Sequence, residues 1–220
     1  MKIILRIGGS VLGSPPDPEL LGDYSAIITK LKKSGHSVGV VVGGGPVARE
    51  YIDSARRTGL SHKDQDLIAI QASRLNARLA GMRFGVSEVC TTARQMTLRL
   101  ERDKVAVMGG LRPGITTDTT AAIVATAWEA DILVKASDQK GIFTADPRTH
   151  KSATLIPSIG YGDLERILGG THKPGIHSII DPIAVGFIAK ARLRVVVVDG
   201  RRPANVLKAV SGRPVGTLVS

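Results

Sequence analysis

Short runs of β-branched and other apolar residues, each bounded by turn residues, constrain the fold of this chain more than any other feature. They cover residues 3–7, 38–42, 104–108, 132–135 and 194–198. Runs that stay apolar, without alternating polar residues, suit strands that are buried on both faces of a parallel sheet. The sequence therefore predicts a central sheet that is covered by helices on both sides.

Segments with helical periodicity lie between these runs. They cover residues 18–34, 47–58, 65–81, 119–130, 163–168, 182–191 and 203–211. Strands that alternate with helices predict an α/β fold with a mostly parallel sheet. Pro182 and Pro203 suit the first turns of their helices, because proline lacks the N–H group that would be unsatisfied there.

The size and composition predict one domain, or two lobes that share one sheet. The chain has 220 residues, of which 43% are hydrophobic, and it contains no repeat or linker that would separate independent domains. Its single cysteine, Cys90, cannot form an intrachain disulfide, which indicates a reducing compartment. The apolar run at residues 3–7 is too short for a signal sequence or a membrane span. We therefore expect a cytoplasmic protein with no membrane partner.

The formal net charge of +11 favours anionic partners. The basic residues are nevertheless scattered in short clusters, such as residues 30–33 and 201–202, and aromatic residues make up 3% of the chain. So few aromatic rings offer little surface on which unpaired bases could stack. Small anionic ligands are thus expected in preference to nucleic acid.

Three glycine-rich turns each follow a predicted strand. They are Gly8-Gly9-Ser10, Gly43-Gly44-Gly45 and Gly109-Gly110. Ligands of parallel sheets bind beyond the carboxyl ends of the strands, so the three turns can converge on one crevice. Glycine lets the backbone approach a ligand, and the helix N-termini that follow offer free N–H groups to phosphate. Arg49, one turn into the next helix, could reach the same anion.

The two standard nucleotide-binding motifs do not occur at these turns. The chain has no GxxxxGK[ST] sequence, and no GxGxxG sequence follows the first strand. A fourth segment, residues 111–120, is dense in hydroxyl groups and turn formers and then opens into an alanine-rich helix. Its cation, backbone donors and helix N-terminus would suit a phosphate or a ribose. Thr117 or Asp118 could cap the helix, and a cap can coexist with a ligand.

These motifs resemble the amino acid kinase superfamily and, within it, the archaeal-type UMP kinases. The resemblance covers essentially the whole chain, and it is most specific at residues 73–77, 113–118 and 144–147. It implies a three-layer αβα sandwich with a mostly parallel central sheet, the carbamate kinase-like fold. It further implies a single domain over residues 1–220, with an acceptor-binding lobe at about 1–125 and an ATP-binding lobe at about 126–220.

The resemblance also implies which residues bind each substrate. Those assigned to UMP are Gly44, Asp66, Leu111, Arg112, Pro113, Gly114, Ile115, Thr116 and Thr117. Those assigned to ATP are Gly8, Gly9, Ser10, Gly45, Arg49, Ser137, Asp138, Phe143, Asp146 and Lys173. Catalytic roles would belong to Arg6, Gly9 and Arg49, and no protein metal ligand is implied.

The implied reaction is transfer of the γ-phosphoryl group of ATP to UMP, giving UDP in pyrimidine nucleotide biosynthesis. Mg²⁺ would bridge the ATP phosphates, while positioning and charge neutralisation would supply most of the catalysis. The acceptor is already an ionised phosphate and needs no strong general base. A homohexamer built as a trimer of dimers, with UTP as a feedback ligand, is implied as well.

Three positions depart from the family pattern. Arg6 stands where many members have lysine, Lys140 stands where an acidic residue is usual, and Gly186 stands where related enzymes often have lysine. Lys173 matches a basic loop position that can reach the ATP phosphates. His172 and His177 lack partners at metal-ligand spacing and are expected to be loop residues.

Two alternatives to a UMP kinase stay open. One is a kinase of the same fold that acts on another small phosphate ester. Isopentenyl phosphate kinases, for example, typically carry a histidine after the second glycine turn, where this chain has Pro46. The other is a nucleotide-sensing or RNA-associated paralogue with little catalytic activity, which Lys140, Gly186 and the positive charge would fit.

Overall fold

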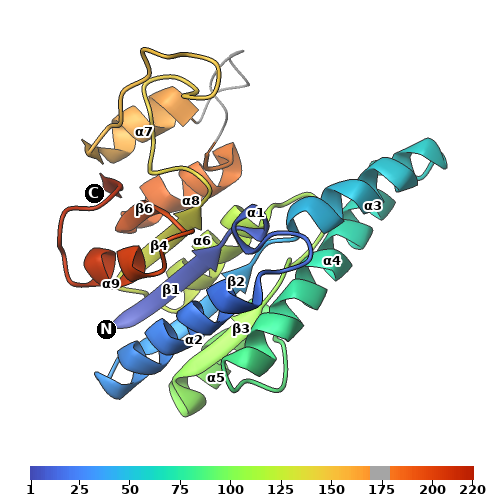
Figure 1. Ribbon diagram of the computed structural model, residues 1–220, viewed down its shortest axis with the longest axis horizontal. Helices are drawn as coiled ribbons and strands as arrows, with labels where there is room; N and C mark the ends of the chain where they lie inside the picture. Colours follow the sequence, from blue (N-terminus) through green and yellow to red (C-terminus); the bar gives the residue numbers. More distant parts are fainter. Residues whose placement is uncertain (169–178) are drawn as a thin grey trace.

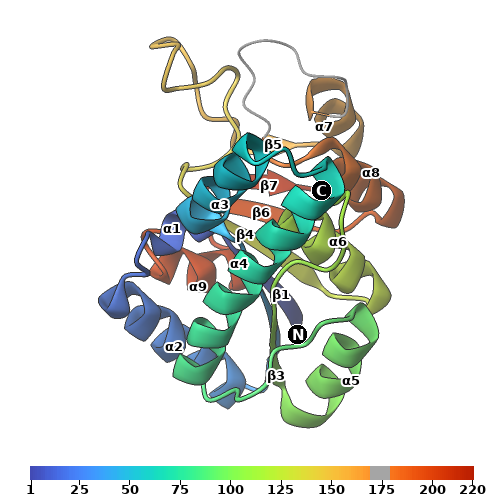
Figure 2. The same cartoon turned by 90° about the vertical axis from the view of Figure 1, so that its right-hand side faces the viewer.

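The computed structural model describes residues 1–168 and 179–220, and its core is a seven-stranded sheet in the order β3-β2-β1-β4-β6-β7-β5 (Figures 1 and 2). The strands are β1 (Lys2–Ile7), β2 (Ser37–Val42), β3 (Val105–Met108), β4 (Ile132–Ser137), β5 (Ser158–Ile159), β6 (Val195–Asp199) and β7 (Thr217–Val219). β1 pairs in parallel with β2 and β4, β2 with β3, and β4 with β6. β7 is antiparallel to β6 and parallel to β5. The predicted α/β class with a mostly parallel sheet is confirmed.

Helices cover both faces of the sheet and complete the predicted three-layer αβα sandwich (Figure 2). They are α1 (Gly9–Leu12), α2 (Pro18–Lys33), α3 (Gly45–Arg57), α4 (His62–Arg83), α5 (Ala93–Asp103), α6 (Thr117–Ala127), α7 (Tyr161–Leu168), α8 (Pro182–Ala191) and α9 (Ala204–Val210). Buried residues of α5, α6, α7 and α8 form one core with the sheet. Those of α1, α2, α4 and α9 form a second core on the opposite face. α3 packs along α4, and Figure 1 shows this pair extending beyond the sheet.

β1 shows why the apolar runs fold as doubly covered strands. Ile3, Leu5 and Ile7 enter the core with α2 and α4, whereas Ile4 enters the core with α5 and α6. Side chains of a strand alternate between its two faces, so an uninterrupted apolar run is needed when both faces are buried. Arg6 interrupts this run on the Ile4 face, two residues before the first glycine turn.

Several local details differ from the sequence prediction. The short strands β5 and β7 and the helices α1 and α5 were not predicted. Pro182 occupies the first turn of α8 as expected, but Pro203 is the N-cap of α9 and so lies just before its helix. Thr116 caps α6, so the prediction of Thr117 or Asp118 as the cap was wrong. The Thr116 hydroxyl accepts from two N–H groups of the first turn, and its extended backbone leaves the next two residues inside the helix.

Candidate functional site

The first two glycine turns are in direct backbone contact at the carboxyl ends of β1 and β2. A Cβ atom built on Gly9 would lie 2.1 Å from the Gly45 nitrogen and 2.6 Å from the Gly43 oxygen. Gly45 itself has a φ of +63°, which L side chains rarely adopt. The Gly43 N–H donates to the Ile7 carbonyl oxygen at 3.0 Å. Glycine is therefore required here both by the close approach and by the turn.

α4 holds the second and third glycine turns. The Asn76 side-chain amide donates to the carbonyl oxygens of Gly43 at 3.0 Å and Gly44 at 3.1 Å. The Ser73 hydroxyl accepts the Gly110 N–H at 2.7 Å. A Cβ on Gly109 would lie 2.7 Å from the backbone nitrogen of Arg74. The structure thus brings all three predicted turns together, and the 73–77 motif is what anchors two of them.

Arg49 lies beside the first turn. Its Nη1 and Nη2 atoms donate to the Ser10 hydroxyl at 3.3 and 3.4 Å, and both side chains are exposed. Arg49 lies near the start of α3, four positions after Gly45. The structure therefore places an accessible cation next to the backbone of two glycine turns.

The segment of residues 111–117 is attached to α4. The Asp66 carboxylate accepts the Gly114 N–H at 2.8 Å, and Gly114 has a φ of +82°. Arg74 donates to the carbonyl oxygens of Gly110 at 3.3 Å and Leu111 at 3.5 Å. Two residues predicted to contact the same ligand, Asp66 and Gly114, are therefore neighbours in space although 48 positions separate them in the chain.

Asp181 joins the start of α6 to the start of α8. Its carboxylate accepts the hydroxyl of Thr116 at 2.5 Å and the hydroxyl of Thr119 at 2.8 Å. The same carboxylate caps α8 by accepting the N–H groups of Ile183 and Ala184, each at 3.0 Å. This carboxylate thus fixes the end of the 111–117 segment against the second half of the chain.

A cluster of two cations and one carboxylate lies under the first glycine turn. Arg6 Nε and Lys135 Nζ lie 2.8 Å and 2.5 Å from the same oxygen, Oδ1 of Asp118. Arg6 Nη2 also donates to the Thr117 hydroxyl at 2.9 Å. Burial opposes ionisation of Asp118, but Arg6 and Lys135 together hold the pKa of this carboxyl below its usual value. Burial, reinforced by the charge of Arg6, lowers the pKa of Lys135 to about 8.

The residues predicted to bind ATP lie around the end of β4 and the loop that follows. Ser137 ends β4, and Asp138 pairs with Arg148 at 2.6 Å. Phe143 and Asp146 line one small pocket together, and the Asp146 carboxylate accepts the Arg148 N–H at 3.0 Å. The Gly8 N–H donates to the Ala136 oxygen at 2.9 Å, which joins this region to the first turn. Lys173, His172 and His177 lie outside the described residues.

Comparison with known proteins identifies the family. The family model for the amino acid kinase family matches residues 1–199. This chain belongs to the amino acid kinase family. The predicted resemblance and the predicted fold are both confirmed.

Relatives that match this chain over nearly their whole length include uridylate kinases. The chain is 36% identical to the uridylate kinase of Hyperthermus butylicus, covering 99% of this chain and 97% of the relative. It is 39% identical to that of Natronomonas pharaonis, covering 100% and 98%. The crystal structure of uridylate kinase from Archaeoglobus fulgidus has a TM-score of 0.91 and 35% identity, with both chains covered completely. A UMP kinase structure from Bacillus anthracis shares the fold, with a TM-score of 0.83 at 20% identity.

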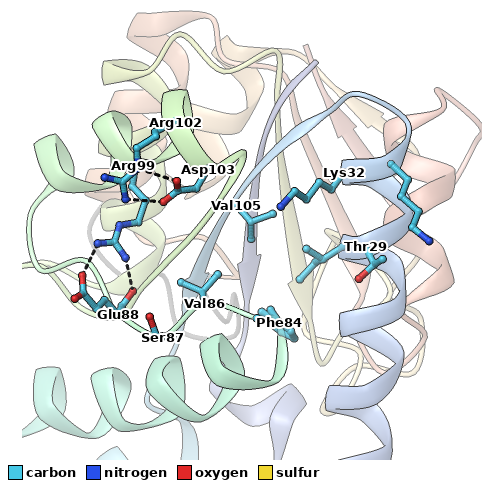
Figure 3. Close-up of a pocket in the computed structure, with 13 residues that line it drawn as sticks. Thr29, Lys32, Phe84, Val86, Ser87, Glu88, Arg99, Arg102, Asp103 and Val105 are labelled. Carbon is cyan, nitrogen blue, oxygen red and sulfur yellow. Dashed lines mark hydrogen bonds and ion pairs between the residues drawn. The ribbon is translucent and has the colours of Figure 1, made fainter.

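One large hollow lies away from the glycine turns. A pocket of about 780 Å³ opens at the amino end of β3, between α2, the residues after α4, and α5 (Figure 3). Its basic side chains Arg99 and Arg102 pair with Glu88 and Asp103 respectively. None of the residues predicted to bind UMP or ATP lines it. The pocket is therefore separate from the predicted substrate-binding residues.

Over residues 1–168 and 179–220, no three His, Cys, Asp or Glu side chains are grouped so that they could share a metal ion. Nor does any helix in these ranges combine the length and apolar character that crossing a membrane requires.

Sequence reasoning missed several residues that organise this amino acid kinase site. Ser73, Asn76 and Asp181 hold the glycine turns and the 111–117 segment in place, and Lys135 belongs to the charged cluster. Ser73 and Asn76 belong to the 73–77 motif, but the sequence alone uses this motif only to indicate the family. Lys135 was visible as a charge inside an apolar run, in the same position relative to its strand as Arg6. Asp181 was visible as the acidic residue before Pro182.

Proposed function

We propose that this amino acid kinase transfers the γ-phosphoryl group of ATP to UMP, producing UDP for pyrimidine nucleotide biosynthesis. The observation that carries this proposal is the backbone contact between the turns of Gly9 and Gly45, with Arg49 beside them. Backbone N–H groups and an accessible cation at one point suit a phosphoryl group that passes between two anionic substrates. Similarity to uridylate kinases over the full length supports UMP as the acceptor.

In this proposal the acceptor lobe, at about residues 1–125, binds UMP. Gly44 approaches the UMP phosphate, and the 111–117 segment surrounds the phosphate and the uracil. Asp66 accepts hydrogen bonds from the ribose hydroxyls. The hydrogen bond from the Gly114 N–H to Asp66 supports this role, because it places the Asp66 carboxylate next to the 111–117 segment, which is proposed to surround UMP.

The ATP lobe, at about residues 126–220, binds the donor. Phe143 flanks the adenine or the ribose, and Asp146 lies near the ribose, which their shared pocket supports. Ser137 and Asp138 lie at the phosphate side, and Lys173 reaches the ATP phosphates. The Gly8, Gly9, Ser10 and Gly45 turns meet the phosphates at the boundary of the two lobes.

The chemistry needs positioning and charge neutralisation more than proton transfer. The amides of the glycine turns and the guanidinium groups of Arg6 and Arg49 bind the oxygens on which negative charge lies in the transition state. Mg²⁺, bound to the ATP phosphates, would neutralise further charge. In this proposal the ion is held mainly by the substrate phosphates and water.

We further propose that the protein is a cytoplasmic homohexamer, a trimer of dimers, with UTP as a feedback ligand. The exposed apolar side chains of α4 support self-association: Leu67, Leu75, Leu79 and Met82. An apolar stripe on one helix is expected to be covered in an oligomer. Analytical ultracentrifugation of the wild type and of Leu75→Glu tests this, with dissociation expected in the variant. UTP inhibition is measured in the assay below.

The activity is tested by following ADP release with Mg-ATP in a coupled assay. UMP, CMP, AMP, GMP and isopentenyl phosphate are compared under identical conditions. Turnover with UMP alone is the expected result. Turnover with another phosphate ester instead would identify the alternative kinase. ATP binding with no turnover on any acceptor would favour the nucleotide-sensing paralogue, for which the exposed Lys140 is the supporting observation.

A further inference from the structure

Lys135 is a cation buried inside the sheet. It lies on β4 directly beside Arg6 on β1, since the two residues are register partners, and its side chain is 6% exposed. Among the described charged groups, Asp118 is the one with which it forms an ion pair. Its other neighbours in a small internal pocket are apolar: Ala121, Leu133, Ile180, Ile188 and Val195. Lys135 is thus one layer removed from any substrate at the glycine turns.

Stability does not explain a lysine at this place. Desolvation and the repulsion of Arg6 both disfavour the charged ammonium, which is why the pKa of Lys135 falls. The charged groups that face it are Arg6 from β1, Asp118 from α6 and Asp181 from the start of α8, while its register partner on β6 is Val197. An apolar side chain of similar volume would avoid the cost of burying the charge.

Lys135 changes how Asp118 can bind Arg6. An arginine and a carboxylate commonly form two parallel hydrogen bonds, which neutralise the guanidinium. Here Lys135 and Arg6 share a single oxygen of Asp118, and the buried Arg6 Nε, although 2.8 Å from that oxygen, has no aligned acceptor. The ion pairs therefore set two cations against one carboxylate, while Asp181 adds a further negative charge that acts on Lys135.

The guanidinium group of Arg6 faces the glycine turns. A Cβ on Gly8 would lie 3.0 Å from Nη1 of Arg6, and a Cβ on Gly43 would lie 3.4 Å from Nη2. The two terminal nitrogens therefore lie against the first two turns, where the phosphoryl group is proposed to pass. Lys135, the register partner of Arg6 on the neighbouring strand, binds the same oxygen of Asp118.

We propose that Lys135 is a positioning residue for phosphoryl transfer, which binds Asp118 Oδ1 and so keeps the Arg6 guanidinium aimed at the glycine turns without full neutralisation. This inference rests on the proposed kinase function. Because Lys135 acts through Asp118 and Arg6, its loss affects the transition state more than the binding of either substrate. It therefore acts on kcat.

The test compares Lys135→Met, which keeps length without charge, with Lys135→Arg, which stays charged at every pH used. Lys135→Met is expected to lower kcat by on the order of 10- to 100-fold. Its KM values for UMP and ATP should stay within about twofold of the wild type. In the wild type, kcat should fall as the pH rises through about 8, where Lys135 loses its proton. Lys135→Arg should keep most of the activity and lack this alkaline fall.

Three results would overturn the inference: an unchanged kcat in Lys135→Met, a change in KM alone, or the same alkaline fall in the wild type and Lys135→Arg. Circular dichroism establishes that each variant is folded. If Lys135→Met does not fold, the pH profiles of the other two proteins decide. If the wild type turns over UMP and Lys135→Met has the same kcat, this inference is wrong but the proposed kinase function stands. If the wild type turns over a different acceptor and Lys135→Met lowers that kcat, only the proposed acceptor is wrong.

Discussion

Gly9 and Gly45 touch through their backbones, so that even one methyl group on Gly9 would lie 2.1 Å from the Gly45 nitrogen. Gly9→Ala must therefore push the two turns apart. We expect it to cost about 1–3 kcal/mol of stability and to lower kcat by roughly 100-fold through misplacement of the phosphoryl group. Urea unfolding and the coupled ADP assay measure the two effects.

The matched control is Gly186→Ala in α8, where an added Cβ meets nothing within 4 Å. This exchange should stabilise the protein by about 0.5–1 kcal/mol, because alanine loses less conformational freedom in a helix. Its kcat should not change. Similar behaviour of the two alanine variants would contradict the proposed role of the Gly9 contact.

Asn76→Ala removes the amide that holds the carbonyl groups of Gly43 and Gly44. We expect a loss of about 1–3 kcal/mol and a higher KM for UMP, because the second turn is no longer fixed. Tyr24→Phe is the control, since the Tyr24 hydroxyl also donates to a glycine carbonyl, that of Gly200 at 2.7 Å. It should lower stability and leave the KM for UMP unchanged. Equal KM effects would argue against a specific role of Asn76.

Asp66→Ala removes both the acceptor for the Gly114 N–H and the proposed ribose contact. The KM for UMP should rise by about tenfold or more, because the proposed ribose hydroxyls and the Gly114 N–H both lose their acceptor. The KM for ATP should stay the same. Asp64→Ala, two positions away on the same helix, is the control for loss of a carboxylate. Steady-state kinetics with each substrate varied in turn would reject the assignment if Asp64→Ala had the larger effect on UMP.

Asp181→Ala separates capping from the bridge between α6 and α8. Asp17 caps α2 with the same kind of bonds, to the N–H groups of Glu19 and Leu20, and within the described part of the chain its carboxylate makes no hydrogen bond to another helix. Asp17→Ala should cost about 1 kcal/mol, the usual value for a helix cap. Asp181→Ala should cost roughly 1–3 kcal/mol more, because the hydroxyls of Thr116 and Thr119 lose a charged acceptor. If Asp17→Ala and Asp181→Ala lost equal stability in urea unfolding, the bridge between α6 and α8 would not contribute to stability.

The buried charge of Lys135 makes stability depend on pH. Its folded pKa of about 8 lies below the value of 10.5 for an exposed lysine, so between these values the unfolded chain binds more protons than the folded one. The free energy of unfolding should therefore rise as the pH rises from about 8 to about 10.5. Below pH 8, Lys135 is charged in both states, so its contribution to stability is lower and does not change with pH. Relative to Lys135→Met, the wild type should gain roughly 3 kcal/mol over this range. Parallel unfolding curves of the two proteins at pH 7.5 and 10 measure the difference, and a constant difference would contradict it.

The five longer strands could be predicted because each of them is buried on both faces. β1, β2, β3, β4 and β6 all overlap the predicted apolar runs. The short strands β5 and β7 span two and three residues, which is too short for any periodic pattern to appear. Their position depends on pairing with distant strands, which local sequence does not encode.

α5 illustrates a different failure. Its apolar residues Met96, Leu98 and Leu100 alternate with polar ones, a spacing typical of a strand. In the structure Met96 and Leu100, four positions apart, are buried, whereas Leu98 is 61% exposed. The helix is therefore selected by packing of the Met96 and Leu100 side chains on the sheet. Gly39 in β2 supplies the space, because a Cβ there would lie 2.9 Å from the Met96 methyl group.

At the candidate site, sequence alone predicted the three glycine turns, Arg49 and the 111–117 segment, and the structure places them together. Their ligands stay predictions. The supporting residues could not be predicted, since Asn76, Asp181 and Lys135 acquire their partners only when separate elements meet. Lys135 and Asp118 become neighbours because β4 lies next to β1 and α6 covers both.

The central position of β1 has a consequence for synthesis of the chain. β1 is made first, and β2 soon covers one of its edges, but the other edge waits for β4, which begins at Ile132. Until then a nascent chain carries an unpaired strand edge flanked by apolar side chains, a surface prone to aggregation. Protein truncated before β4 should therefore be insoluble, and the acceptor lobe should depend on the ATP lobe for its folding.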